Sequence, residues 1–372
     1  MREITLFPSA TGTGRFVSVR ERVRAHVTLP EGSYSVGSSV AAAAGLEDIL
    51  TAWGRELPPL VDPAYRAAYA TWLGGEDIDW GLALGPRGLA AAVAKWRREV
   101  IPLVEEIEEG GYAEVLIRGR HVLEALQPIR VSETRVRSLI EAGVPLSSFL
   151  PHRGSECPPV KYDHSTKTGR LKVVDGPRVL TLPKEHRGIL ASRYPGGRIV
   201  SVDFVSLEPR LALHAVGRAG SGDAYEEMSQ QMGEPRARTK IATLSFLYGA
   251  ASSDGVASDV RAKVREHFRV DRLREVILGC RGRNAYGRPL PVDEDRLLIP
   301  HWVQSSAVDV CLLGFSEVVD RLGALADPLF LVHDALFLDV PPENLQGVSA
   351  AVAEGVNVSP FGHFAFSLNG LE

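Results

Sequence analysis

Apolar residues follow two different patterns along this chain of 372 residues. In the first half they recur every three to four positions, which predicts amphipathic helices over 87–110, 114–127 and 132–143. Continuous apolar runs bounded by turn residues come later. They lie at 198–205 and 328–341 and predict buried strands, the second run forming two strands around a tight turn.

Further elements complete this outline. Helical spacing of apolar positions covers 236–249 and 299–322, and the run 360–370 predicts a closing strand. Residues 1–85 are rich in Ala, Gly and Pro with acidic spots. They predict a helical region to which the sequence assigns no role.

Several classes of protein are disfavoured. The longest apolar runs, near Val40 and Val308, are far shorter than the roughly 20 residues that a membrane-spanning helix needs. The first residues lack the basic start and apolar core of a secretion signal, so we expect a cytoplasmic protein with no membrane partner. Cys157, Cys280 and Cys311 form no CxxC pair, which favours neither disulfides nor a zinc site. Cys311, inside an apolar run, is expected in the core.

Charge is distributed unevenly, although the formal net charge is only −4. Residues 151–200 contain ten Lys and Arg against four Asp and Glu, and residues 236–288 contain twelve against five. The final stretch, 341–372, has three Glu and no Lys or Arg. Two basic blocks fit either a solvated surface or a polyanionic partner.

Two carboxylates stand at the ends of predicted buried strands. Asp203 lies near the end of the first apolar run, and Asp334 lies at the turn between the two later strands. Either residue alone is more typical of a turn or a cap. If the strands are neighbours in one sheet, both carboxylates meet at its edge and can hold divalent cations such as Mg²⁺. Two such metals can promote an in-line phosphoryl displacement.

A second group of side chains lies on one predicted helix. Arg236, Lys240, Leu244 and Tyr248 are spaced every four residues, with Gly249 following. This spacing places two cations, an apolar residue and an aromatic ring on one face. Such a stripe suits a triphosphate at one end and a nucleobase at the other. A surface helix with solvated cations is the alternative.

In this order, the pieces resemble the motifs of family A DNA polymerases from about Lys161 onward. Motif A is similar to "VSVDFVSLEPRLALHA", motif B to "RARTKIATLSFLYG" and motif C to "LVHDALFLDVP". The resemblance implies an α+β right-hand fold with an antiparallel palm sheet and helical fingers and thumb. The implied parts are an N-terminal helical region at 1–85, a thumb at 86–160, a palm at 161–215 and 289–372, and trimmed fingers at 216–288.

The resemblance also implies roles for single residues. Asp203 and Asp334 would hold two Mg²⁺ ions, with Mn²⁺ as a substitute. Arg236 and Lys240 would bind the triphosphate, and Glu208 would exclude a ribose 2′-hydroxyl. The other implied contacts to nucleotide and template are Leu244, Tyr248, Gly249 and Tyr225. The implied contacts to DNA are Lys161, Lys167, Thr168, Arg170, Lys172, Arg296, Gln304 and His333.

The chain departs from the family pattern at several positions. Leu244 stands where Phe or Tyr is usual, and Ala335 stands where motif C commonly has Glu. Tyr225 replaces a phosphate-contacting His, and Ser206 replaces a Gln. We therefore expect weaker stacking on the incoming base and two firm carboxylates rather than three.

The implied function is a DNA-directed DNA polymerase that adds dNTPs to a primer 3′-hydroxyl. We find no Asp-x-Glu motif in the first 160 residues and expect no 3′–5′ exonuclease. The alternatives are a phage-type single-subunit RNA polymerase and a catalytically degenerate scaffold that binds DNA. Expected partners are primer-template DNA, dNTPs, and replisome or phage proteins.

Overall fold

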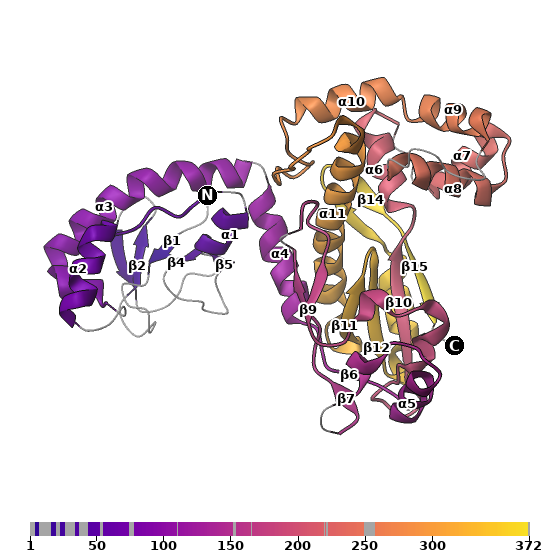
Figure 1. Ribbon diagram of the computed structural model, residues 1–372, viewed down its shortest axis with the longest axis horizontal. Helices are drawn as coiled ribbons and strands as arrows, with labels where there is room; N and C mark the ends of the chain where they lie inside the picture. Colours follow the sequence, from indigo (N-terminus) through magenta and orange to yellow (C-terminus); the bar gives the residue numbers. More distant parts are fainter. Residues whose placement is uncertain are drawn as a thin grey trace. The chain divides into compact units, whose positions relative to one another are not determined.

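The computed structural model describes residues 4–6, 16–19, 23–26, 34–36, 44–52, 55–73, 78–109, 111–151, 154–164, 166–218, 220, 222–248 and 257–370. They belong to two compact units, Met1–Ile117 and Arg118–Glu372 (Figure 1). Each unit combines helices with a sheet, which is mixed in the first unit and antiparallel in the second, and this agrees with the predicted α+β class.

The first unit contains a sheet that the sequence did not predict. Five strands pair in the order β3-β2-β1-β4-β5. Their bounds are Ile4–Leu6, Phe16–Val19, Val23–His26, Tyr34–Val36 and Ala44–Gly45 for β1 to β5. The prediction of a helical region at 1–85 is therefore wrong for these segments, because strands of two to four residues are too short to show an alternating pattern.

Helices follow this sheet. They are α1 (Leu46–Ala52), α2 (Pro63–Leu73) and α3 (Trp80–Glu109). The helix predicted over 87–110 is confirmed as the main part of α3. The first turns of α3 are set apart by Gly85, whose φ of 63° and ψ of 172° are not helical. Trp96 and Val100 belong to the buried face of α3, and the Trp96 Nε1 donates to the Pro58 carbonyl at 2.7 Å.

The second unit is built on a four-stranded antiparallel sheet in the order β11-β12-β10-β15. These strands are β10 (Arg198–Phe204), β11 (Asp327–Val332), β12 (Ala335–Val340) and β15 (Phe366–Gly370). The predicted strand at 198–205 and the predicted pair at 328–341 are confirmed. The single closing strand predicted at 360–370 is wrong. It forms two strands in different sheets, because β14 (Gly362–Phe364) pairs with β13 (Val356–Val358) instead.

Short strand pairs and helices surround this sheet. The pairs are β6 (Ile129–Arg130) with β7 (Glu156–Cys157) and β8 (Lys161–Asp163) with β9 (Lys172–Asp175). The helices are α4 (Tyr112–Glu124), α5 (Glu133–Glu141), α6 (Leu207–Ala215), α7 (Ala224–Met232), α8 (Arg236–Leu247), α9 (Ser258–His267), α10 (Val270–Gly279), α11 (Leu298–Leu322) and α12 (Leu345–Ala353). The long α11 packs against α6 and β13, and α8 packs against α7 and α9 (Figure 1).

Aromatic side chains cover both faces of the sheet. Phe330 and Phe337 stack with ring centroids 4.4 Å apart inside a buried cluster. Phe204 packs edge to face against Phe315 of α11 at 5.1 Å and against Phe366 of β15 at 4.6 Å. Burial of each such ring contributes about 2 kcal/mol to the free energy of folding. The end of β10, next to Asp203, is therefore held by packing.

Candidate active site

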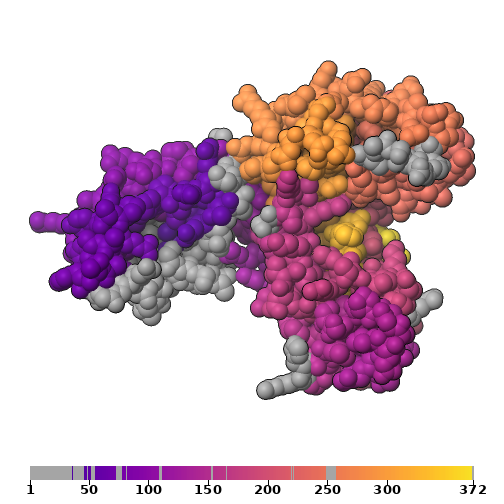
Figure 2. Space-filling model, viewed as in Figure 1, coloured from indigo at the N-terminus to yellow at the C-terminus, as the bar shows by residue number. Residues whose placement is uncertain are grey.

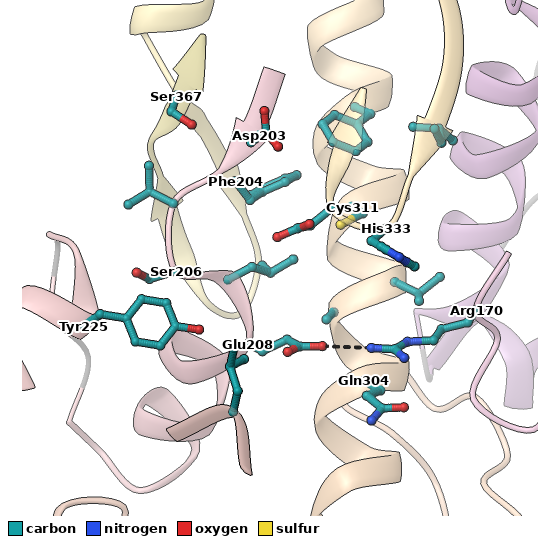
Figure 3. Close-up of a pocket in the computed structure, with 18 of the residues that line it drawn as sticks. Arg170, Asp203, Phe204, Ser206, Glu208, Tyr225, Gln304, Cys311, His333 and Ser367 are labelled. Carbon is teal, nitrogen blue, oxygen red and sulfur yellow. Dashed lines mark hydrogen bonds and ion pairs between the residues drawn. The ribbon is translucent and has the colours of Figure 1, made fainter. Parts of the chain in front are cut away.

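A cavity of about 760 Å³ lies in the second unit and is lined by residues of β10, α6, α8, α11 and the β11–β12 turn. Figure 2 shows a hollow between the orange helical part and the magenta part of this unit, with yellow C-terminal residues at its base. Most of the predicted site residues line the cavity. They are Arg170, Asp203, Glu208, Tyr225, Arg236, Lys240, Leu244, Tyr248, Gln304, His333 and Asp334. Figure 3 labels Arg170, Asp203, Glu208, Tyr225, Gln304 and His333 among them.

The remaining predicted residues do not line the cavity. Lys161, Lys167, Lys172 and Arg296 each form a surface ion pair, for example Lys161 with Asp175 at 3.0 Å. Thr168 is buried, and Gly249 lies outside the described residues. The assignment of these residues to DNA or template contacts stays a prediction.

The strands that carry the two carboxylates are neighbours in one sheet, which was the condition set by the sequence analysis, and both residues line the cavity. β10 pairs with β12, and the backbone N–H of Phe204 donates to the Asp334 carbonyl at 3.2 Å. His333, with a φ of 55°, forms the tight turn that presents Asp334. Burial raises the pKa of Asp334, and the negative charge of Asp203 raises it further. Two carboxylates that repel one another in this way favour a bound cation.

The oxygen ligands present fit Mg²⁺. In proteins this ion is commonly held by one or two carboxylates and completes its coordination with water and substrate phosphates. The described part of the chain contains no group of three or more His, Cys, Asp or Glu side chains that could hold a metal by themselves. Asp203 and Asp334 supply two carboxylates of this kind to the cavity.

Cations face these carboxylates from α8. Arg236, Lys240, Leu244 and Tyr248 all line the cavity, so the predicted stripe is confirmed as one face of the helix. The ring of Tyr225, which is only 7% exposed, lies 5.8 Å from the Arg236 guanidinium and 5.6 Å from the Lys240 ammonium. Burial raises the pKa of Tyr225 well above its usual value, so its hydroxyl stays neutral. The two cations thus share one aromatic neighbour, which holds them side by side.

Asp223 is a site residue that the sequence reasoning missed. Its side chain caps the N-terminus of α7 by accepting from the Tyr225 N–H at 2.9 Å. It also accepts from the Ser206 hydroxyl at 2.5 Å and from Arg236, whose Nη2 lies 2.5 Å from Oδ2. Burial acts to raise the pKa of Asp223, but the hydrogen bonds from Ser206 and Arg236 outweigh it and lower the pKa. An Asp before a helix was the available signal.

Glu208 lies between Arg170 and Tyr248 and interacts with both side chains. Its side chain is 16% exposed, and Arg170 Nη2 donates to its Oε1 at 3.3 Å (Figure 3). The Arg170 guanidinium also lies 5.4 Å from the Tyr248 ring. Burial raises the pKa of Glu208, although hydrogen bonds from Tyr248 and Arg170 counteract this shift. Glu208 is therefore fixed in orientation by partners from two separate segments.

A buried ion pair positions the segment that carries Arg170. Arg288 Nη2 lies 2.5 Å from Asp309 Oδ1, and the two side chains are 5% and 0% exposed. Asn284 Nδ2 also donates to Asp309, at 2.6 Å. Gly169, with a φ of 73°, passes so close that a Cβ would lie 2.5 Å from the Arg288 guanidinium carbon. Glycine adopts this φ without strain and leaves room for the Arg288 side chain, which accounts for the Gly before Arg170 in "TKTGRL".

Other lining residues were not predicted. Ser367 and Asn369 of β15 and Lys184 reach the cavity from segments to which the sequence analysis assigned no site residue. Cys311 is buried, as expected, and burial raises the pKa of its thiol, which therefore stays protonated. The position of β15 beside β10 could not be read from the pattern of residues 360–370.

Comparison with known proteins gives no assignment. Neither protein-family models nor curated proteins match this chain. Within the described segments, every helix is too short or too polar to cross a lipid bilayer. The chemistry of the cavity therefore has to support any functional assignment.

Proposed function

We propose that this protein is a template-directed DNA polymerase with a family A type right-hand fold. The observation that carries the proposal is the meeting of Asp203 and Asp334 with Arg236 and Lys240 around one cavity. Paired carboxylates opposite paired cations match a substrate that combines a divalent metal with a polyphosphate.

In the proposed reaction the primer 3′-oxygen attacks the α-phosphorus of a dNTP. A new bond forms between the primer 3′-oxygen and the α-phosphorus, and the hydroxyl proton passes to water. The bond from the α-phosphorus to the oxygen that bridges to the β-phosphate breaks, so that pyrophosphate leaves. Asp203 and Asp334 would hold two Mg²⁺ ions, or Mn²⁺, which activate the attacking hydroxyl and stabilise the leaving group when bound. Arg236 and Lys240 neutralise the β- and γ-phosphate oxygens, and Tyr225 keeps the two cations together.

Selection of the sugar is assigned to Glu208. A carboxylate that is buried and held by Arg170 and Tyr248 cannot easily move aside for a 2′-hydroxyl. This rigidity favours dNTPs over rNTPs, and hence a DNA polymerase over an RNA polymerase. Leu244, Tyr248 and Gly249 border the base and the template, with Leu244 offering an aliphatic surface in place of an aromatic ring.

Primer-template DNA is the proposed macromolecular partner. Arg170, Gln304 and His333 line the cavity. In this proposal Arg170 would contact the backbone phosphates, Gln304 the minor groove near the new base pair, and His333 the primer end. Burial and the charge of Arg170 lower the pKa of His333, so it acts as a neutral hydrogen-bonding group. The exposed Lys161, Lys167, Lys172 and Arg296, with Thr168, would follow the DNA backbone, which makes binding sensitive to salt. We place this activity in the cytoplasm, alone or with replisome or phage proteins.

Primer extension with Mg²⁺ tests the proposal. We expect wild type to extend a primer with dNTPs and Asp203→Ala and Asp334→Ala to lose this activity by roughly a thousandfold or more. Asp259→Ala is the matched control, because Asp259 lies in the first turn of α9 and does not line the cavity. Robust extension with rNTPs would instead identify an RNA polymerase. Binding of primer-template without extension in any variant would identify a non-catalytic scaffold.

A further inference from the structure

Polar side chains stand in two rows across the sheet of the second unit. β10 lies between β12 and β15, and the register pairs Asp203 with Ala335 on one side and with Ser367 on the other. The neighbouring row pairs Ser201 with Asn369. Directly paired residues of antiparallel strands, and residues two apart, place their side chains on the same face. Asp203 is thus flanked by neutral residues on both sides, and Figure 3 shows Ser367 beside it.

One oxygen of Asp203 accepts two side-chain hydrogen bonds. Ser201 Oγ donates to Oδ2 at 2.7 Å, and Asn369 Nδ2 donates to the same oxygen at 3.1 Å. Asn369 Nδ2 also donates to Ser367 Oγ at 3.3 Å. The amide nitrogen faces Asp203 because an ionised carboxylate can only accept. Among the described residues, no side chain donates to the other oxygen, Oδ1.

We propose that Asn369 is a positioning residue for the metal-binding carboxylate of Asp203 and that it acts together with Ser201. This inference rests on the proposed function. Metal ligands are commonly oriented by hydrogen bonds from residues that do not touch the metal. Ser201 and Asn369 reach Oδ2 from two adjacent strands, which restrains rotation of the carboxylate and leaves Oδ1 for the cation.

The orientation of Asp203 matters here because the proposed metal site uses two carboxylates, while Glu208 and Asp223, which also line the cavity, are paired with arginines. Ala335, which pairs with Asp203 across the sheet, supplies no third acid. If the Asp203 carboxylate rotated freely, ordering it on metal binding would cost conformational entropy. With only two protein ligands, this cost would offset a large part of the free energy of metal binding. Hydrogen bonds from neutral donors fix the carboxylate without adding the repulsion of a third negative charge.

The location of Asn369 makes it possible to test its positioning role without disturbing the fold. Its side chain is exposed, and β15 is an edge strand of the sheet. The backbone ladder between β10 and β15 does not depend on the amide group. Substitutions at Asn369 should therefore leave the fold intact while altering the environment of Asp203.

Binding of Mn²⁺ to the full chain, without nucleotide or DNA, tests the inference through the paramagnetic resonance signal of the free ion. We expect Asn369→Ala and Ser201→Ala to raise the Kd for Mn²⁺ by roughly tenfold. Asn369→Asp should lower the Kd by roughly fivefold, because it adds a carboxylate beside Asp203. Asn357→Ala, at an exposed position of β13, is the control and should bind as wild type does. A higher Kd for Asn369→Ala with an unchanged melting temperature is not expected of a residue that only supports the sheet.

Two results would overturn the inference. The first is a Kd of Asn369→Ala equal to that of wild type, with wild type active in primer extension; the proposed function then stands without this role for Asn369. The second is a lower melting temperature for Asn369→Ala with an unchanged Kd, which would make the residue structural. If wild type neither extends primers nor binds Mn²⁺, the proposed function itself fails, and the inference fails with it.

Discussion

The two sides of the cavity are built on supports of different strength. The acidic wall, which we define as β10, β12 and the turn with Asp334, rests on a sheet whose two faces are covered, and all six residues of β12 are buried. The basic wall, defined as α7 and α8, rests on helices at one end of the unit. Only Thr239, Ala242, Thr243 and Leu247 of α8 are buried, and Ile241 is 56% exposed.

This difference in burial suits the two walls to different tasks. A metal site needs ligands fixed within a few tenths of an ångström, and a buried sheet provides that. Cations that bind a polyphosphate can tolerate more movement, because charge attraction falls off slowly with distance. We infer that the acidic wall is the fixed reference and that the basic wall adjusts to the nucleotide.

The largest effect is expected on the basic wall. Lys240→Ala removes a cation that lies against the Tyr225 ring and lines the cavity, so kcat/KM for dNTPs should fall by about a hundredfold or more. Steady-state primer extension measures this change. Arg238→Ala is the matched control, because Arg238 lies on the same helix, does not line the cavity and has a 60% exposed side chain. Equal losses in both variants would mean that charge on α8 acts only from a distance.

Hydrogen exchange compares the two walls directly. We expect the central amides of β12 to exchange at least about tenfold more slowly than those of α8, because fewer residues of α8 are buried. Addition of dNTP and Mg²⁺ should slow exchange in α8 and leave β12 unchanged. Slower exchange in β12 as well would show that the acidic wall also becomes ordered on binding.

A smaller effect is expected on stability at the acidic wall. Because the folded state raises the pKa of Asp334 above its usual 3.8, the folded protein binds this proton more tightly than the unfolded chain does. Stability is therefore lost as the pH rises from about 3.8 through the raised pKa. Without divalent cations at pH 7, Asp334→Asn should melt higher than wild type by roughly 2–4 °C.

This gain should disappear as the pH falls toward 3.8, and it should shrink when Mg²⁺ is added to wild type. Calorimetry of both proteins in a chelating buffer measures it, with Asp259→Asn as the surface control. A lower melting temperature for Asp334→Asn at pH 7 would contradict the idea that the two carboxylates repel one another.

The smallest effect concerns Leu244. Leu244→Phe places a ring on the half-buried face of α8 that lines the cavity, so the preference for dNTPs over dideoxynucleotides should change by a few-fold. Ile241→Phe lies on the same helix outside the cavity and serves as the control. An unchanged ratio in Leu244→Phe would show that this residue does not face the sugar.

The sequence predicted those parts of the site that depend on long, regular elements. Continuous apolar runs predicted the strands that carry Asp203 and Asp334. Four-residue spacing predicted the face of α8 from Arg236 to Tyr248. Asp223 and Asn369 could not be found in this way, because their importance arises from contacts with residues 13 and 166 positions away. The five-stranded sheet of the first unit was missed because its strands are too short to carry a pattern.

Gly169 gives the molecule a vulnerable point outside the residues that line the cavity. A side chain there would be strained at a φ of 73°, and its Cβ would have to displace the end of the Arg288 side chain, which pairs with the buried Asp309. In a library of random variants, we expect replacements at position 169 to be depleted, as replacements of Asp203 and Asp334 should be. Its variants would be lost through poor folding and low yield, whereas variants of Asp203 would accumulate as intact but inactive protein.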